Sequence, residues 1–254
     1  MKTVAITYAG RSVALPDLRD YRKFYRKLAT GTWEPRTFEV LARHLDRETV
    51  YVDIGAWIGV TPFWASHLAK RVIAVEPDPK CCEILRALAP RYDNVTVLEG
   101  ALSPDRSVTL HAVDGFGSSE TSVLDIGEGP RAAAAGFSMD EIMAHAGDAP
   151  VFVKIDIEGY EYSAGAEIAK LSGYRLNGLQ IAIHPQLYEK SLRGNGLTRR
   201  LRTVWKTWKL SRMFRGLFPA PRIVKYRSVT SYLLSGILLR NIPKGADFVF
   251  ERVS

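Results

Sequence analysis

The chain alternates between strand-like and helix-like segments from about residue 49 onward, and this order is its strongest constraint on the fold. Apolar stretches predict strands at 49–54, 71–76, 94–100, 107–113, 151–156 and 178–184, and FVFERV predicts one near the chain end. Helical patterns occupy 61–70, 79–89 and 138–146, the last with Ser138 as its N-cap. The alternation predicts an α/β fold: a doubly wound, mostly parallel sheet with helices on both faces.

The length of 254 residues fits one large domain. We expect four parts within it: an N-terminal hairpin and helical cap over 1–45, a core over 46–189, a basic helical insertion over 190–227 and a closing helix and strand over 228–254. Helical patterns at 18–29 and 35–44 fill the cap. The tract RAAAA at 131–135 reads only as low complexity.

Composition favours a cytoplasmic protein. The two cysteines, Cys81 and Cys82, are adjacent, and neighbours rarely bridge each other, so we expect reduced thiols. The N-terminal sequence has no apolar core of signal-peptide length. No run of about 18 apolar residues, the length needed to cross a bilayer, occurs in the sequence.

The first predicted strand ends in D-x-G-x-x-x-G, formed by Asp53, Gly55 and Gly59. Ligands of doubly wound sheets lie at the carboxyl ends of the strands, and glycine lets a ligand approach the backbone. The spacing differs from the G-x-G-x-x-G motif that holds a dinucleotide pyrophosphate. An aspartate here suits a ligand with an ammonium group. The alternative is an ordinary strand-to-helix turn.

The second strand ends at Glu76, 21 positions after Gly55. A carboxylate there can accept both hydroxyls of a ribose, although it can also stabilise the start of the next helix. Ribose without a pyrophosphate loop, together with an ammonium group, describes S-adenosylmethionine. We therefore predict this cofactor.

The third strand end is the predicted adenine side. The two residues that precede Ala101 at this strand end are Gly100 and Glu99. The adenine contact can rest on Glu99, on backbone amides near Ala101, or on Ser118 and Ser119, and the residues alone leave these alternatives open.

The fourth strand ends in KIDIEGYE, where Asp156, Glu158 and Glu161 follow an apolar stretch. We interpret Asp156 as facing the methionine part of the cofactor and the acceptor, since a sulfonium and an ammonium explain carboxylates at this place. For Glu161 we favour a plainer role, the stabilisation of a helix N-terminus.

In these motifs the chain resembles the FkbM-type family of class I methyltransferases over roughly residues 30–185. GTWEP, YVDIGAWIGV, VIAVEPDP, NVTVLEGALS, FSMDEIM and VKIDIEGYE occur in the family's order. The resemblance implies a Rossmann-like, seven-stranded sheet and cofactor roles for Asp53, Gly55, Gly59 and Glu76. It also implies that Glu34 and Asp156 line the site. Such enzymes typically methylate a hydroxyl of a sugar, glycan or similar product.

His184 ends the fifth strand, where relatives often have an acid followed by a histidine. A neutral imidazole there can take the proton of an acceptor hydroxyl, and Asp156 and Glu158 are the competing bases. The alternative is a structural hydrogen bond. The five histidines show no short ligand spacing, so we predict no metal.

The basic excess of the chain, +8 in all, lies in one late segment. Residues 190–246 hold 14 Lys and Arg without any Asp or Glu, leaving 21 basic residues elsewhere against all 27 acidic ones. Apolar residues follow helical spacing from Leu197 to Trp208, and the stripe then shifts by about half a turn at 100° per residue. This predicts two short helices, or one helix wedged between two surfaces.

We consider four roles for this segment: a lid for an anionic acceptor, a contact with an anionic membrane, an RNA-binding surface and a solvated face. RNA binding is least favoured, because no RNA-binding module accompanies the charge.

The whole sequence thus predicts an S-adenosylmethionine-dependent O-methyltransferase of saccharides or similar hydroxylated metabolites. The alternatives are a non-catalytic scaffold on the same fold, or an enzyme with a lipid-linked or nucleic-acid substrate.

Overall fold

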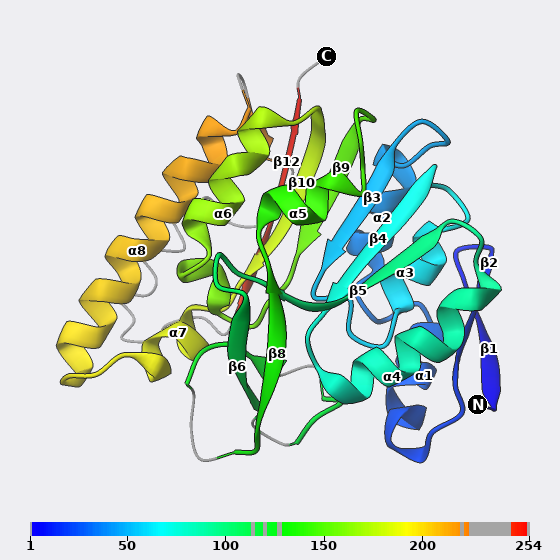
Figure 1. Cartoon of the computed structure of the whole chain (residues 1–254), viewed down its shortest axis with the longest axis horizontal. Coiled ribbons are helices and arrows are strands. Elements are labelled where there is room, and N and C mark those ends of the chain that lie inside the picture. The colour runs from blue at the N-terminus through cyan, green and yellow to red at the C-terminus, as the bar shows by residue number, and fades with distance from the viewer. Residues whose placement is uncertain are drawn as a thin grey trace.

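The computed structural model describes residues 2–112, 115–118, 121–125, 129–218, 221–223 and 245–252 (Figure 1). Its strands are β1 (Thr3–Tyr8), β2 (Arg11–Pro16), β3 (Val50–Ile54), β4 (Arg71–Glu76), β5 (Val95–Leu102), β6 (Ser107–Ala112), β7 (Thr121–Ser122), β8 (Arg131–Phe137), β9 (Val151–Ile155), β10 (Leu176–Ile183), β11 (Pro221–Ile223) and β12 (Ala246–Arg252). Its α-helices are α1 (Arg22–Ala29), α2 (Pro35–His44), α3 (Val60–Ala65), α4 (Pro79–Leu88), α5 (Met139–Ala144), α6 (Gly165–Ala169), α7 (Pro185–Ser191) and α8 (Gly196–Gly216).

The large sheet has the predicted doubly wound topology, with more strands than the seven expected. Its order is β11-β12-β10-β9-β3-β4-β5-β8-β6-β7, ten strands among the described residues. The strands from β10 across to β8 are parallel to one another, and β12 runs antiparallel to β10. Seven of the ten match the predicted strands, namely β3, β4, β5, β6, β9, β10 and β12. The strands β7, β8 and β11 were not predicted.

The strand β8 corrects our reading of the RAAAA tract. Alanine is depleted in strands, so the stretch carries no strand signal of its own. Its backbone instead pairs on both sides, with Gly100–Leu102 of β5 in parallel and with Ser107–His111 of β6 in antiparallel register. Tertiary pairing therefore overrides the weak local propensity.

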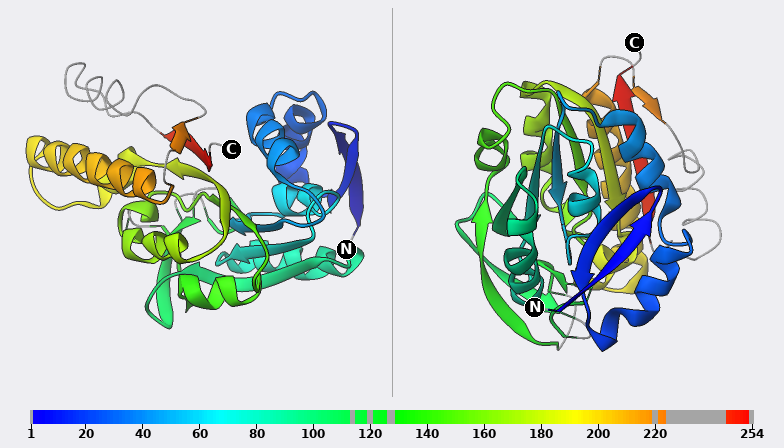
Figure 2. Two further views of the ribbon diagram at one scale, coloured as in Figure 1. Left: turned by 90° about the horizontal axis from the view of Figure 1, so that it is seen from above. Right: turned by 90° about the vertical axis from the view of Figure 1, so that its right-hand side faces the viewer.

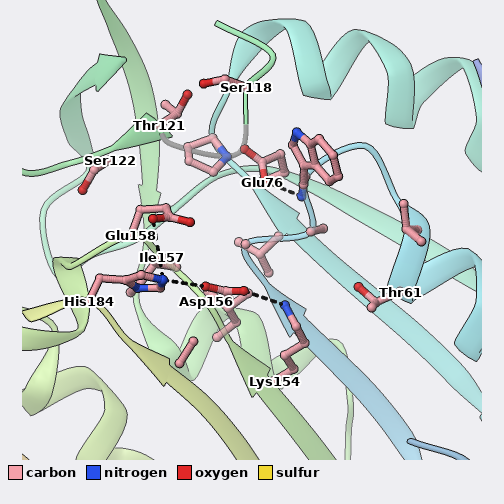
Figure 3. A pocket seen from close by; sticks show the side chains of 18 of the residues that line it. Thr61, Glu76, Ser118, Thr121, Ser122, Lys154, Asp156, Ile157, Glu158 and His184 are labelled. Carbon is pink, nitrogen blue, oxygen red and sulfur yellow. Dashed lines mark hydrogen bonds and ion pairs between the residues drawn. The ribbon is translucent and has the colours of Figure 1, made fainter. Parts of the chain in front are cut away.

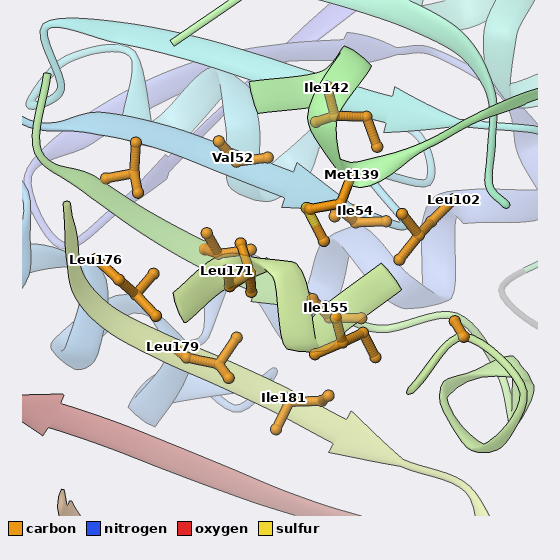
Figure 4. Close-up of a cluster of buried hydrophobic side chains, with 14 of the residues drawn as sticks. Val52, Ile54, Leu102, Met139, Ile142, Ile155, Leu171, Leu176, Leu179 and Ile181 are labelled. Atoms are coloured by element: carbon orange, nitrogen blue, oxygen red, sulfur yellow. The ribbon is translucent and has the colours of Figure 1, made fainter. Parts of the chain in front are cut away.

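Helices cover both faces of the sheet, as the continuous apolar strands predict. Val50, Val52 and Ile54 of β3 point into one core, which also contains residues of α5 and α8 (Figure 4). Tyr51, which lies between Val50 and Val52 in β3, points into the other core, and this core is shared with the N-terminal hairpin and α1–α4. The alternation places every second residue of a strand on the same face, so one strand supplies both cores.

The switch point of the sheet lies between β3 and β9. The chain runs from β3 to β4 and β5 on one side, whereas β9 and β10 lie on the other. Ile54 pairs with Ile155, and the amide of Asp156 donates to the carbonyl of Ile54 at 2.9 Å. The ends of these two strands therefore meet where a doubly wound sheet binds its ligand.

The basic segment forms one helix, α8, so the prediction of two short helices is wrong. Asn195 caps it by accepting from the amide of Thr198 at 2.9 Å. Its C-terminal half packs on the core through Leu210 and Phe214, which are 4% and 1% exposed. The apolar stripe from Leu197 to Trp208 stays exposed, so the described residues supply no second surface for it. Residues 224–244 lie outside the described residues, and the boundaries at 190–227 and 228–254 stay predictions.

Candidate active site

A pocket of about 570 Å³ lies at the carboxyl ends of the parallel strands (Figure 3). This volume is within the range of small-molecule sites. Residues from the ends of β3, β4, β5, β9 and β10 line it, together with the N-terminal segment around α1. Five strand ends thus converge on one cavity, as the sequence predicts.

The two glycines of the first motif serve different purposes. Gly55 has a φ of 91°, and a Cβ built on it would lie 1.9 Å from the carbonyl oxygen of Asp156. Only glycine therefore allows the β3 and β9 ends to touch at the pocket wall. Gly59 lies outside the pocket lining, and its Cβ would meet the ring of Phe63 at 2.3 Å, so its role is to start α3.

Glu76 lies in the pocket wall with both carboxylate oxygens held by backbone amides. Oε2 accepts from the amide of Trp57 at 2.7 Å and Oε1 from that of Asp78 at 2.8 Å. Burial raises the pKa of Glu76 to about 8, while the two backbone bonds oppose this rise. Each oxygen keeps capacity for one more donor, which is what the two hydroxyls of a ribose require.

Asp78 organises the predicted adenine side, a role that the sequence reasoning missed. Its Oδ1 caps α4, while Oδ2 accepts from the amide of Gly117 at 2.8 Å and from Thr121 Oγ1 at 2.7 Å. The carbonyl of Gly117 in turn accepts from the hydroxyl of Tyr21 and the indole of Trp57. These bonds hold the 115–118 loop over the pocket. An aspartate directly before Pro79, at a helix start, was the available signal.

Of the three adenine alternatives, Ala101 and Ser118 line the pocket. Glu99 does not; its carboxylate forms an exposed, bidentate pair with Arg86, with oxygens at 2.8 and 2.5 Å. The strand alternation turns this side chain toward α4, so the structure gives no support to Glu99 as a cofactor residue. Ser119 lies outside the described residues.

Asp53 does not line the pocket itself, but it contacts Lys154, which does. It is fully buried, accepts from Thr61 Oγ1 at 2.5 Å, and lies 3.4 Å from Lys154 Nζ, which also lies 3.5 Å from Asp156. Burial disfavours the charge of Lys154, but Asp53, Asp156 and Glu34 raise its pKa above the usual value. Asp53 therefore positions Lys154 in place of the predicted contact with an ammonium group.

Lys154 was missed although its signal is visible, a charged residue inside the apolar strand VFVKI.

Glu34 faces the pocket from the N-terminal cap, with a left-handed backbone at φ 41°. Thr37 Oγ1 donates to its carboxylate at 3.2 Å. Desolvation by the surrounding protein raises the pKa of Glu34 to about 7, opposed by Lys154 and reinforced by Asp156 and Asp247. Its position agrees with the expectation that it lines the site.

His184 lies among three carboxylates on the acceptor side, and two of them, Asp156 and Glu158, are labelled beside it in Figure 3. Its Nδ1 is 3.2 Å from Glu161 Oε1, and its Nε2 is 3.6 Å from both Asp156 and Glu158. Burial lowers the pKa of His184, but the bond to Glu161 and the three negative charges outweigh burial and raise it to about 10. His184 is therefore protonated at neutral pH, whereas the sequence analysis expected a neutral imidazole.

Glu161 corrects a second expectation. It is fully buried, and besides His184 it accepts from the amide of Ile157 at 3.0 Å. It thus orients the imidazole as well as stabilising the start of a short 3-10 helix over Tyr160–Tyr162. An acid five residues after a strand end gives no sequence signal for this contact, because His184 is 23 residues away.

Asp156, Glu161 and His184 also form the group of described residues that could hold a metal ion, with their ligand atoms within 4.8 Å of one another. Two of these buried carboxylate oxygens, one on Asp156 and one on Glu161, have no hydrogen-bond partner. Removal of metal ions by a chelator would distinguish a metal site from a proton-transfer site.

The strand order, the switch-point pocket and the ribose-type carboxylate define a class I methyltransferase. A family model described as the methyltransferase FkbM domain matches residues 53–191. The chain therefore belongs to the FkbM methyltransferase family and uses S-adenosylmethionine as its methyl donor. No curated protein matches the chain.

Solved structures similar to this chain include several nucleic-acid enzymes. A Streptococcus mutans methyltransferase-like protein in complex with SAH covers 86% of this chain and 97% of its own, with 12% identity and a TM-score of 0.48. An rRNA methylase from Streptococcus thermophilus (12% identity, 86% and 95% covered) gives 0.43, and the Methanococcus jannaschii fibrillarin pre-rRNA processing protein (12%, 82% and 68%) gives 0.44.

Proposed function

We propose that this methyltransferase acts on a hydroxyl group of a saccharide or a similar neutral, hydroxylated metabolite. The observation that supports this most is the pairing of His184 with Glu161, with Nε2 directed toward Asp156 and Glu158 at the pocket. A hydroxyl must lose its proton when it is methylated, and an oriented imidazole is a suitable acceptor.

S-adenosylmethionine, when bound, supplies an activated methyl group on a sulfonium. The chain's own part is to bind the ribose at Glu76, to position the acceptor and to receive its proton. Glu161 holds the imidazole through Nδ1, so Nε2 is the atom that takes the proton. Because the pKa of His184 is raised, a fraction of the enzyme that grows with pH has this nitrogen free.

The charge of the pocket favours a neutral acceptor over an anionic one. Asp156, Glu158 and Asp247 line the acceptor side, against the cations of Lys154 and His184. Lys23 and Lys27 line the same pocket from α1. A phosphate or carboxylate placed beside the three acidic side chains would meet like charges in a partly desolvated site. Carboxylates can instead accept hydrogen bonds from neighbouring hydroxyls of a polyol. This argues against both an acidic glycan and a nucleic-acid backbone at this position.

The proposal is tested by supplying a deuterated methyl donor with libraries of glycans, free sugars and lipid-linked sugars. Mass spectrometry should detect a labelled methyl group, and NMR should place it on oxygen. With the acceptor found, His184→Ala should lower turnover by roughly 10²-fold or more with SAH affinity little changed. Normal turnover by His184→Ala would assign the base elsewhere.

A chelator should leave the wild-type rate unchanged under the proposed mechanism. Loss of activity with recovery on adding Mg²⁺ would contradict it, and would assign the Asp156, Glu161 and His184 group to a metal. Binding of SAH without transfer to any hydroxylated acceptor would instead favour the non-catalytic alternative.

A further inference from the structure

The large hydrophobic side chains that are exposed in the described part of the chain all lie on α8. They are Leu197, Leu201, Trp205 and Trp208, with 70%, 55%, 57% and 44% of their surface exposed. Their spacing of four, four and three residues places them on one stripe of the helix. Burying such a stripe is favourable, so its exposure indicates a contact with something outside this chain.

This stripe points away from the body of the protein. The buried residues of α8 are Thr203, Thr207, Leu210, Ser211 and Phe214, and at about 100° per residue the centre of this set lies about 130° from the centre of the exposed stripe. Figure 2 shows α8 extending from one edge of the molecule. The C-terminal half therefore anchors the helix, and its outer face is free to dock.

Basic side chains flank the exposed stripe. Arg202, Lys209, Arg212 and Arg215 are exposed. Lys209 Nζ lies 5.4 Å from the ring centre of Trp205, and the Arg212 guanidinium lies 5.0 Å from that of Trp208. With no acidic residue between 190 and 246, the face has no negative charge of its own. Arg199, Arg200 and Lys206, equally basic in the sequence, are half-buried.

We propose that the outer face of α8 docks on an anionic lipid membrane, with the four apolar side chains at the boundary between headgroups and acyl chains. Tryptophan and leucine on one side, with lysine and arginine beside them, are the features of helices that lie in a membrane interface. Anionic lipids supply the missing counter-charge, which strengthens binding at each basic residue. The proposal concerns a surface contact, since no helix in the described residues is long and apolar enough to span a bilayer.

Two other occupants fit the same face less well. A second copy of the chain would bring two basic surfaces together without an acid between them. RNA would match the charge, but its phosphate backbone offers no apolar surface against which Leu197 and Leu201 could be buried. A bilayer surface matches both the charge and the apolar stripe.

Docking here would also orient the pocket. The helix α7 begins at Pro185, directly after His184, and leads into the exposed end of α8. The acceptor side and the docking face therefore belong to one short stretch of chain. The membrane contact does not depend on the proposed function, because it is tested without any acceptor.

The test uses the full chain and vesicles of phosphatidylcholine, with or without phosphatidylglycerol. Wild type should co-sediment with the anionic vesicles only, and less so as salt is raised. Brominated lipids should quench its tryptophan fluorescence. Two double variants should each lower the partition coefficient by about tenfold or more: one with Trp205→Ala and Trp208→Ala, the other with Lys209→Glu and Arg212→Glu. For the second, each basic residue at an anionic surface is worth about a factor of five.

Lys70→Glu with Arg71→Glu is the matched control, because it makes the same charge change on exposed residues away from α8. It should bind vesicles nearly as well as wild type, and all variants should keep their thermal midpoint. Equal losses in both charge variants would overturn the proposal, as would equal binding to neutral vesicles. It would also be overturned by RNA binding or dimerisation through Trp205 and Trp208 without any vesicle binding.

Discussion

At the scale of single residues, the chemistry of the site depends on how neighbouring charges shift the pKa of the His184 imidazole. Of the groups around His184, Glu161 raises the pKa of the imidazole most, and it does so against the effect of burial. A histidine with a raised pKa is stabilised in its protonated form. It is therefore inactive as a base at low pH, and it becomes available as the pH rises toward about 10.

We predict that kcat/KM for the acceptor rises with pH over the neutral and alkaline range. The midpoint should lie below that of the free enzyme, since the cationic donor opposes the imidazolium in the same pocket. Glu161→Gln should move this rise to lower pH, because the first cause of the raised pKa is removed, and should also lower the maximal rate. A rise at the same pH in both enzymes would show that the titrating group is not His184 coupled to Glu161.

The residues also show what sequence patterns can and cannot predict. Glu76, Gly55, Asp156 and His184 were predicted to lie at strand ends, and they line one pocket, because parallel strands bring their carboxyl ends together. Asp53 was placed at the pocket by the same reasoning, but its side chain is fully buried behind the pocket wall and contacts the lining residues Lys154 and Thr61. The face toward which a strand-end residue points depends on register, which the sequence alone does not give.

At the scale of elements, α8 shows how one helix can serve two environments. Its core side is anchored beside the active site: the hydroxyls of Tyr162 and Thr207 are 2.8 Å apart, and Thr207 Oγ1 also donates to the carbonyl of Thr203 at 2.8 Å. Thr207 has a single hydroxyl proton, so Tyr162 is the donor between the two. Tyr162 directly follows Glu161, and this bond therefore links the helix to the site.

We predict that Thr207→Val lowers the free energy of unfolding by about 1–3 kcal/mol, because it removes both of these buried hydrogen bonds while keeping the side-chain shape. Tyr162→Phe should cost about 1 kcal/mol, since it removes one. Thr203→Val, the same change one turn earlier, removes only an intrahelical bond to Arg199 and is the matched control. Urea denaturation measures all three; a larger cost for Thr203→Val than for Thr207→Val would contradict this role of the anchor.

The elements divide clearly into those that the sequence predicts and those that it does not. Apolar strands and capped helices of the core were predicted within a few residues, because each carries a local signal such as the capping box of Ser138 and Glu141. The strand β8 was missed, because its alanines take their conformation from their neighbours. The shift of the apolar stripe in α8 was recognised, and two short helices or one helix wedged between two surfaces were offered to explain it. The structure has one helix, and the stripe from Leu197 to Trp208 is exposed, because an exposed tryptophan looks the same in sequence as a buried one.

At the scale of the whole molecule, a pocket rich in carboxylates and a basic outer helix belong to the same chain. The pocket gathers carboxylates around two buried cations, which suits a cationic donor and a neutral hydroxylated acceptor. The helix α8 carries the opposite charge on its exposed side. Charge is thus separated between the site of chemistry and the proposed site of docking, and a basic segment need not touch the substrate.

We propose that this pocket binds the cofactor with its ribose at Glu76. Titration calorimetry with SAH tests it most directly, on wild type, Glu76→Gln and Glu99→Gln. We predict that Glu76→Gln weakens binding by about 2 kcal/mol, or about thirtyfold in Kd, because the side-chain NH₂ would face a backbone N–H and leave one ribose hydroxyl without an acceptor. Glu99→Gln changes an exposed carboxylate outside the pocket and should bind as wild type does. Unchanged affinity in Glu76→Gln, or an equal loss in Glu99→Gln, would contradict the assignment.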